Sequence, residues 1–165
     1  MPATPDQLFA YFDELGIPHA TVTHPPLFTV EDGRDWHDKI PGLHCKNLFL
    51  KDKKDVIWLA VLPADKRADI GQLAKRVGAA RLSFGKPDLL LDILGITPGS
   101  VTPFALINDT ARRVRVVLDC DLMQSETVNF HPLHNAASTT IRTADLARFI
   151  TTLGYAPVTV DCGGL

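Results

Sequence analysis

Three short stretches of the sequence carry residue types that could act on an ester or a phosphate. The first holds Lys46 and Asn47, at the start of an apolar run. A lysine ammonium can hold a phosphate group, or the negative charge that develops on a carbonyl oxygen during ester hydrolysis. Most lysines in a strand lie on its solvated face, so Lys46 alone does not establish a site.

The second stretch begins with glycine and ends with proline, Gly99-Ser100-Val101-Thr102-Pro103. Glycine permits a ligand to approach the backbone closely, and proline holds the far end of the loop rigid. Successive backbone N–H groups in such a turn can bind an anion. By spacing alone, the segment is more typical of an ordinary connection between a helix and a strand.

The third stretch is His131-Pro132-Leu133-His134-Asn135. An imidazole can transfer a proton, donate or accept a hydrogen bond, or simply shape a pocket. No local partner proves any of these roles for His131, so the residues alone assign it none.

Nucleophilic and metal chemistry have weaker support. Cys45 follows His44, but adjacent residues of a strand point to opposite faces, so the two cannot pair directly. No pair of histidines or cysteines has zinc-site spacing together with a matching second pair. The sequence also lacks a glycine-rich nucleotide loop and a Gly-x-Ser-x-Gly elbow. We therefore expect neither a metal nor a cofactor. The residue types that could ligate a metal occur at His37, His44, Cys45, Asp119, Cys120, His131 and His134.

Helical and strand patterns alternate along the chain. Apolar runs on both sides of a polar corner at residues 51–55 predict a hairpin whose first strand carries Lys46. A second hairpin is predicted from residues 104–107 and 114–118, which are apolar and β-branched around a polar turn. The segment 27–42 fits either a short helix or a loop that crosses the site, and the sequence does not decide between them. The remaining predictions are helices over 4–15, 68–77, 86–94 and 143–153, the last capped by Thr143, and strands over 19–23, 81–84, 127–130, 138–141 and 157–160.

These elements favour an α+β fold. Because strands and helices interleave and hairpins occur among them, we expect a mixed, largely antiparallel sheet, partly barrel-like, with helices packed around it. The chain has 165 residues, of which 45% are hydrophobic and 22% charged, and no linker is visible. A single domain over residues 1–165 with a normal core is therefore expected.

Charge and cysteine content limit the cellular location and the kind of partner. Three scattered cysteines form no disulfide framework, no apolar run could span a membrane, and no secretion signal is visible, so a soluble cytoplasmic protein is expected. The formal net charge of −2 argues against an extensive nucleic-acid footprint. A local basic patch is still available from Lys46, Lys51, Lys53, Lys54, Lys66, Arg67, Lys75 and Arg76.

The ordered combination of the three stretches resembles a known family, the YbaK/prolyl-tRNA-synthetase-associated editing domains, which deacylate mischarged tRNA. The matching segments are CKNLFLKDKK at 45–54, GSVTP at 99–103 and FHPLHNAAST at 130–139. The resemblance extends from about Phe9 to Tyr155, nearly the whole chain. Within the family, the chain is most similar to the freestanding alanyl-tRNA(Pro) deacylases of the ProX type.

This resemblance implies a role for each stretch. It implies that activity depends on Lys46, with Asn47 beside it as a positioning residue. It implies that the loop Gly99, Ser100, Val101, Thr102 and Pro103 binds the aminoacyl group, and that His131 lies in the pocket as a hydrogen-bonding or pocket-shaping group. Weaker candidates for the pocket lining are Asn135 and Thr139, and for its walls Phe28, Thr29, Val30 and Phe130.

The resemblance implies the acceptor end of mischarged tRNA(Pro) as partner, with prolyl-tRNA synthetase as a second candidate, and no membrane. Two alternatives stay open. One is Cys-tRNA(Pro) deacylation, as in some relatives, and the other is a noncatalytic module that binds tRNA or the synthetase.

Overall fold

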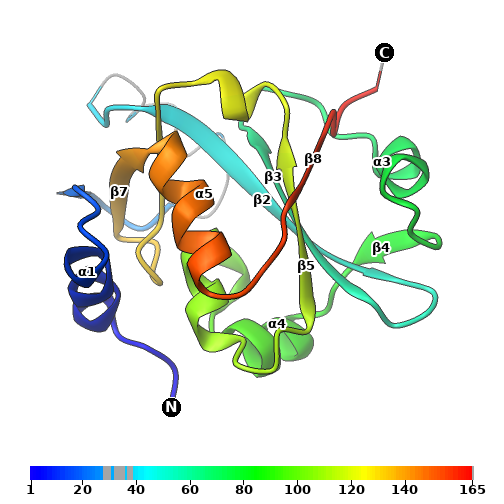
Figure 1. Cartoon of the computed structure of the whole chain (residues 1–165), viewed down its shortest axis with the longest axis horizontal. Coiled ribbons are helices and arrows are strands. Elements are labelled where there is room, and N and C mark those ends of the chain that lie inside the picture. The colour runs from blue at the N-terminus through cyan, green and yellow to red at the C-terminus, as the bar shows by residue number, and fades with distance from the viewer. Residues whose placement is uncertain (28–30, 32–35, 37–38, 165) are drawn as a thin grey trace.

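A mixed β-sheet organises the chain, for which the computed structural model describes residues 1–27, 31, 36 and 39–164. Its strands run in the order β1-β7-β6-β2-β3-β5-β8, and β4 pairs with β2 beside this path. Among the described residues four pairings are antiparallel and three parallel, so the predicted mixed sheet is confirmed. The sheet is not closed, because β1 and β8 lie at its two ends (Figure 1). The strands are β1 (Ala20–Thr23), β2 (Leu43–Asp52), β3 (Ile57–Pro63), β4 (Leu82–Phe84), β5 (Val114–Asp119), β6 (Thr127–Phe130), β7 (Ala137–Arg142) and β8 (Val158–Val160).

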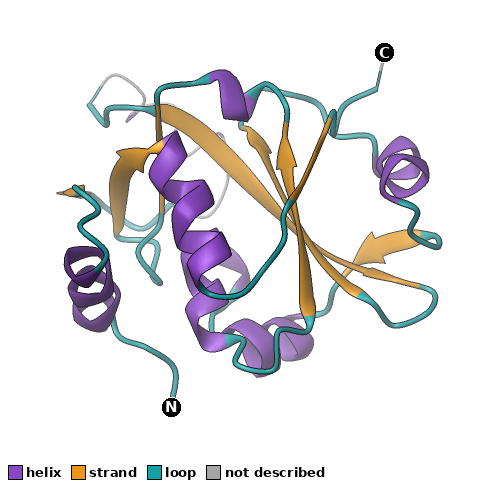
Figure 2. Ribbon diagram, viewed as in Figure 1, coloured by secondary structure: helices purple, strands orange, loops and turns teal. Residues whose placement is uncertain are grey.

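Helices cover both faces of the sheet (Figure 2). Helices α1 (Pro5–Glu14), α4 (Pro87–Leu94) and α5 (Thr143–Thr152) pack with a buried 3-10 helix (Pro103–Asn108) over the larger core. Helix α3 (Ile70–Val77) covers a smaller core on the opposite face. The other short 3-10 helices are Pro98–Ser100 and Leu122–Gln124.

The helix ends follow the local sequence. Thr4 begins α1 with a capping box, in which its hydroxyl accepts from the Gln7 N–H and the Gln7 side chain accepts from the Thr4 N–H. Helices α3 and α4 end at Gly78 and Gly95, both in the left-handed region (φ 72° and 67°) that glycine adopts without strain. Both helices end where the predicted ranges 68–77 and 86–94 end.

The hairpin of β2 and β3 forms as predicted around its charged corner. Asp52, which is buried, organises the corner because its carboxylate accepts from the backbone N–H groups of Lys54 (2.8 Å) and Val56 (3.0 Å). Side chains on the two strands then alternate between faces. Phe49 and Leu59 belong to the larger core, whereas Leu50 and Trp58 belong to the smaller one.

Two sequence predictions were wrong. The run Phe104–Ile107 is a 3-10 helix and not a strand, and Val114 begins a strand that pairs in parallel with β3, so no second hairpin forms. Thr143 does not cap α5, because Arg142 occupies the N-cap position and the Thr143 hydroxyl lies 3.2 Å from that of Ser125. In both cases tertiary partners override a local pattern that fits more than one conformation.

One edge of β2 is left uncovered over a short length. Strand β3 takes one edge, while the other is paired by β6 at Leu43 and His44 and by β4 from Leu50 onward. The Gly85 N–H also donates to the Phe49 carbonyl (2.9 Å) on that edge. Between these contacts, residues 45–48 have no strand partner on this side among the described residues. We call this gap the β2 notch.

Gly85 holds β4 against β2 in a way that no other residue allows. A Cβ added there would lie 2.4 Å from Cδ2 of Phe49, which is buried in the larger core. We expect Gly85→Ala to lower the free energy of unfolding by about 1–3 kcal/mol, the usual result of overpacking. Urea denaturation of both variants measures this. Gly71→Ala is the matched control, because its Cβ meets nothing closer than 3.4 Å and alanine favours a helix. A loss of stability no larger than that of the control would contradict the expectation.

Candidate functional site

The β2 notch carries both residues of the first predicted stretch. Lys46 pairs with Leu62 and Asn47 with Val61, so strand alternation sends their side chains to opposite faces of the sheet. Lys46 lies on the side of the smaller core and Asn47 on the side of the larger core. The two residues therefore flank the same opening from its two faces.

Asn47 connects the notch to the glycine loop. Its Nδ2 donates to the carbonyl of Val101 at 3.1 Å, across 54 residues of sequence. Its Oδ1 is buried and has no hydrogen-bond partner among the described residues. An unsatisfied buried acceptor costs about 1–3 kcal/mol, so this oxygen could readily accept a hydrogen bond from a ligand.

A small cavity opens beside this contact. It has a volume of about 200 Å³ and lies between the notch, the glycine loop and the end of β4. Its lining includes Asn47, Leu48, Phe84, Gly85 and Val101. Asn47 of the first predicted stretch and Val101 of the second, far apart in sequence, thus line one cavity, whereas Lys46 lies outside its lining.

The glycine loop is already partly hydrogen-bonded within itself. The Ser100 N–H donates to the Thr97 carbonyl (2.9 Å), and the Thr102 hydroxyl accepts from the Phe104 N–H (3.2 Å). Ser100, Thr102 and Pro103 are buried, whereas Gly99 and Val101 are partly exposed. The part of the loop that a ligand can touch is therefore centred on Gly99 and Val101.

His131 follows directly after β6, the strand that borders the notch. The last parallel pair of β6 and β2 is Asn129 with His44, and His131 and Lys46 each follow two residues after that pair. His131 Nδ1 lies 3.0 Å from the carbonyl of Ala137, which only accepts, so Nδ1 carries the proton and Nε2 is left as an acceptor. Burial lowers the pKa of His131, and the charges of His24 and His134 act in the same direction.

The lowered pKa predicts a pH dependence of stability. The unfolded chain protonates this histidine near its ordinary pKa of 6.5, while the folded chain keeps it neutral to lower pH. The resulting stabilisation is present above about pH 6.5 and is lost as pH falls. We expect the stability difference between wild type and His131→Gln to narrow from pH 7.5 to pH 5.5 in urea denaturation. His19→Gln, at a partly exposed site, controls for losing an imidazole, and an equal narrowing there would contradict the expectation.

A second histidine near His131 was missed by the sequence analysis. The rings of His24 and His131 lie 6.2 Å apart. His24 is buried; its Nδ1 lies 2.8 Å from the Pro25 carbonyl and its Nε2 2.9 Å from the Ser138 hydroxyl. Because the carbonyl requires Nδ1–H, Ser138 donates to Nε2. Ser138 is only 4% exposed, so the pair supports β1 and β7 rather than meeting a substrate. Nothing in the local sequence signalled this contact.

None of the remaining described pocket candidates lines the cavity at the notch. Phe130 packs in the larger core, with its ring 5.4 Å from that of Phe104. Asn135 accepts from the Leu27 N–H through its backbone carbonyl (3.0 Å). Thr139 is fully buried, with its hydroxyl 2.7 Å from that of Thr21. The other wall candidates, Phe28, Thr29 and Val30, lie outside the described residues.

The cysteine next to the notch is not an activated nucleophile. Burial strongly raises the pKa of the Cys45 thiol, which donates to the Leu43 carbonyl (3.4 Å). The three cysteines are free.

An acidic group elsewhere has the donor types of a metal site, which the spacing rules had not identified. The ligand atoms of Asp119, Cys120 and Asp121 lie within 4.8 Å of one another. However, the Lys66 ammonium already contacts Asp119 (2.9 Å), Asp121 (2.8 Å) and Asp161 (2.6 Å). A lysine therefore supplies the positive charge there.

Contacts within the protein reduce the number of available cations in the basic patch expected from sequence. Lys66 is neutralised by three acids, Lys51 pairs with Asp55 (3.2 Å), and the Arg76 guanidinium donates to the carbonyls of Asp161 and Gly163. Within the described part of the chain, no ion pair engages the side chains of Lys46, Lys53, Lys54, Arg67 and Lys75.

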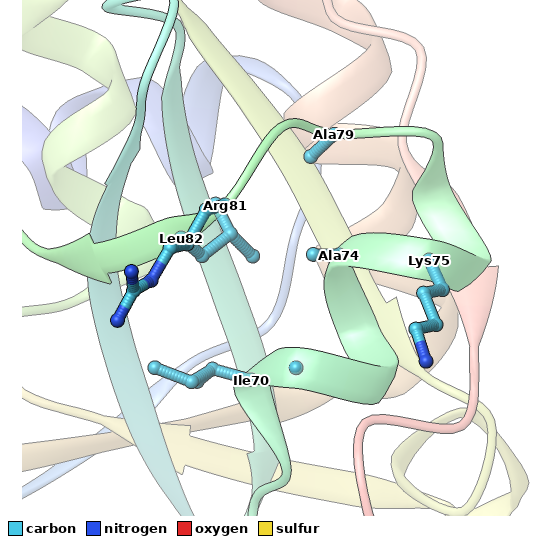
Figure 3. Close-up of a pocket in the computed structure, with 7 residues that line it drawn as sticks. Ile70, Ala74, Lys75, Ala79, Arg81 and Leu82 are labelled. Atoms are coloured by element: carbon cyan, nitrogen blue, oxygen red, sulfur yellow. The ribbon is translucent and has the colours of Figure 1, made fainter.

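A larger hollow, of about 470 Å³, lies between α3 and β4 (Figure 3). Ile70 and Ala74 of α3 form its apolar part together with Leu82, and Arg81 and Lys75 extend on opposite sides of it. Lys75 of the expected basic patch lines this hollow, but none of the residues predicted to hold the ester does. Cavity volume alone therefore does not identify the functional site. The smaller cavity at the notch is the better candidate, because residues predicted for the site line it. Among the described residues, no helix is both long and apolar enough to cross a membrane.

Comparisons with known proteins identify the family and the fold. Residues 24–149 match the family described as aminoacyl-tRNA editing domain. The chain is 37% identical over 154 residues to the prolyl-tRNA synthetase associated domain-containing protein 1 of Danio rerio, covering 92% of this chain and 84% of that protein. It is 33% identical over 144 residues to the prolyl-tRNA editing protein ProX of Acetoanaerobium sticklandii, covering 87% and 88%. A crystal structure described as a candidate trans-editing enzyme for prolyl-tRNA synthetase has the same fold, with a TM-score of 0.72 at 17% identity over the whole of both chains.

Proposed function

Because this chain belongs to the aminoacyl-tRNA editing domain family, we propose that it hydrolyses the ester of mischarged tRNA, with Ala-tRNA(Pro) as its substrate. The observation that carries the proposal is the hydrogen bond from Asn47 to Val101, which draws the lysine strand and the glycine loop to one cavity. Both segments belong to the pattern on which the resemblance rests. A relative named as a prolyl-tRNA editing protein supports the choice of tRNA.

Such an activity has a clear physical need. Alanine is smaller than proline, so a synthetase pocket that admits proline cannot exclude alanine by size. Binding differences of about one methylene give only about 10–200-fold discrimination. A second site that accepts the methyl side chain and rejects the prolyl ring would remove the error after it is made.

The roles of the residues follow from their positions. The Lys46 ammonium would hold the terminal phosphate or the charge that develops on the ester carbonyl oxygen. Asn47 would position the aminoacyl group through its unsatisfied Oδ1, against the loop at Gly99 and Val101. His131 would offer Nε2 as a hydrogen-bond acceptor at the far side of the notch.

Water activation is assigned to the substrate. The ribose hydroxyl beside the ester lies next to the reacting carbonyl, so positioning alone can supply much of the rate. Lys46 carries no hydrogen bond or ion pair of its side chain within the described residues, which leaves the ammonium available for this substrate.

The test is a deacylation panel. Purified protein is incubated with Ala-, Cys- and Ser-charged tRNA(Pro), and the loss of each ester is followed over time. Faster hydrolysis of the alanyl ester supports the proposal, whereas preference for the cysteinyl ester would identify a Cys-tRNA(Pro) deacylase. Binding of tRNA without turnover of any ester would identify a noncatalytic module.

The domain organisation, the cellular location and the partners are part of the same proposal. We expect a single editing domain over residues 1–165 that acts in the cytoplasm, where free thiols such as those of Cys45, Cys120 and Cys162 persist. Its partner is the acceptor end of mischarged tRNA(Pro). A complex with prolyl-tRNA synthetase is the second expected partnership, which co-purification of the two proteins would test.

A further inference from the structure

We propose that the exposed ring of Phe84 stacks on an unpaired base of the tRNA 3′ end, while the neighbouring cations Lys53, Lys54, Arg81 and Lys86 face its phosphates. We call these five residues the β4 strip. The inference rests on the proposed function, because it names the surface that leads the acceptor end to the β2 notch.

Phe84 is an aromatic side chain that the fold leaves in solvent. Its exposed fraction is 64%, although it belongs to a strand that pairs directly with the central strand β2. The ring lines the same 200 Å³ cavity as Asn47 and Val101. An exposed ring at the mouth of a site fits a ligand with a flat face, and base stacking needs only such a face.

The backbone under Phe84 is fixed. Phe84 pairs with Leu50, and the Gly85 N–H donates to the Phe49 carbonyl at 2.9 Å. The contact of Gly85 with the Phe49 ring leaves no space for a side chain at that position. The exposure of Phe84 is therefore a property of the sheet and not of a loose loop.

The cations lie on the segments around this ring. The Lys53 N–H donates to the Arg81 carbonyl (3.1 Å), which joins the corner of the β2–β3 hairpin to the start of β4. Lys86 stands at the N-cap of α4, two residues after Phe84. Figure 1 shows β4 beside this hairpin corner, at the same side of the molecule.

The charge of these cations is not cancelled by the protein. Lys53, Lys54, Arg81 and Lys86 are exposed, and their side chains make no ion pair with described residues. The acids closest to them in sequence are Asp52, Asp55 and Asp88. Asp52 is buried and accepts from the backbone N–H groups of Lys54 and Val56, Asp55 pairs with Lys51, and Asp88 lies in the first turn of α4. A short positive strip beside one aromatic ring complements a single strand of nucleic acid better than an apolar partner.

The small extent of the strip also accounts for the overall charge. A duplex-binding footprint needs many cations, which a chain of net charge −2 does not have. A few cations beside one ring are enough for two or three nucleotides of an unpaired end. Specificity for the ester would then come from the cavity and affinity from the strip.

Binding of a short RNA tests the strip without requiring turnover. The probe is a fluorescein-labelled, single-stranded RNA of eight nucleotides ending in CCA, followed by fluorescence anisotropy at several salt concentrations. We expect Phe84→Ala to weaken binding about tenfold, Phe84→Leu nearly as much, and Phe84→Tyr little, because only tyrosine keeps the stacking face. The double variant Lys53→Gln/Lys54→Gln should reduce the slope of log K against log salt by about 1.4, at about 0.7 for each phosphate contact to a single strand.

Two controls match the type of residue but lie away from the strip. Leu91→Ala removes another exposed apolar side chain, 56% exposed on α4, and Arg67→Gln removes an exposed cation that makes no ion pair with described residues. Both should bind the RNA as wild type does. Equal binding by wild type and Phe84→Ala, or equal weakening by Phe84→Leu and Leu91→Ala, would overturn the inference.

The deacylation panel separates this inference from the proposed function. If the alanyl ester is hydrolysed but Phe84→Ala leaves KM for the charged tRNA unchanged, the role proposed for the β4 strip is wrong and the proposed function stands. If no ester is hydrolysed but Phe84→Ala still weakens RNA binding, the strip stands and the function is wrong.

Discussion

Lys46→Ala should lower kcat/KM for Ala-tRNA(Pro) by about 100-fold or more. The ammonium lies on the uncovered edge of β2 and is unpaired within the described part of the chain, so its charge is available to the substrate. Removing one preorganised group that stabilises developing charge typically costs 10²–10³ in rate. Initial rates of deacylation over a range of tRNA concentrations measure the effect.

The next lysine of the same strand provides the control. Lys51 is on β2 but is held by Asp55 at 3.2 Å, so Lys51→Ala should stay within about twofold of wild type. Lys46→Arg should recover only part of the activity, because a planar guanidinium places its charge differently from a compact ammonium. Full activity of Lys46→Ala would remove Lys46 from the role assigned to it.

The largest expected effect on stability is that of Lys66→Met. Its ammonium contacts three carboxylates, among them Asp119, whose side chain is fully buried. Without Lys66 this carboxylate keeps only the N–H donors of Asp121 and Cys162. A buried charge that loses its partner costs about 3–5 kcal/mol, and we expect about 3 kcal/mol here because the two N–H groups remain.

The pH dependence identifies the cause of that loss. Hydrogen bonding to Lys66 lowers the pKa of Asp161 below its ordinary value of 3.8, so the stabilisation is present above that pH and is lost as pH falls. Urea denaturation should show the gap between wild type and Lys66→Met narrowing toward pH 3 by the part that comes from Asp161. Lys75→Met, at an exposed lysine without an ion pair in the described structure, should be near neutral at every pH. A gap that does not narrow at all would contradict a contribution from the Lys66–Asp161 ion pair.

Most helices and strands were predictable because local sequence and tertiary structure agree. Glycine stops at Gly78 and Gly95 and the alternating runs of β2 and β3 correspond to elements that form. The segment Phe104–Ile107 failed because four apolar residues fit a buried turn as well as a strand. Its conformation depends on Thr102, which accepts from the Phe104 N–H, and that contact is part of a fully buried cluster.

The candidate site was predictable in its residues more than in its arrangement. The sequence singled out Asn47 and Val101, which the structure brings into contact. It did not show that Lys46 and Asn47 face opposite sides of the sheet around a gap, because the gap depends on which strands border β2. That order joins segments about 30 to 85 residues apart and leaves no local signal.

An unpaired strand edge normally invites association with other molecules, since its free peptide groups can template a foreign strand. In this protein the opening in β2 is only four residues long, and β6 and β4 close it at both ends. An intruding chain would collide with these neighbours before it could form a continuous ladder. The same interruption that we propose as the entry for a small acyl group is therefore too short to support aggregation through the central strand.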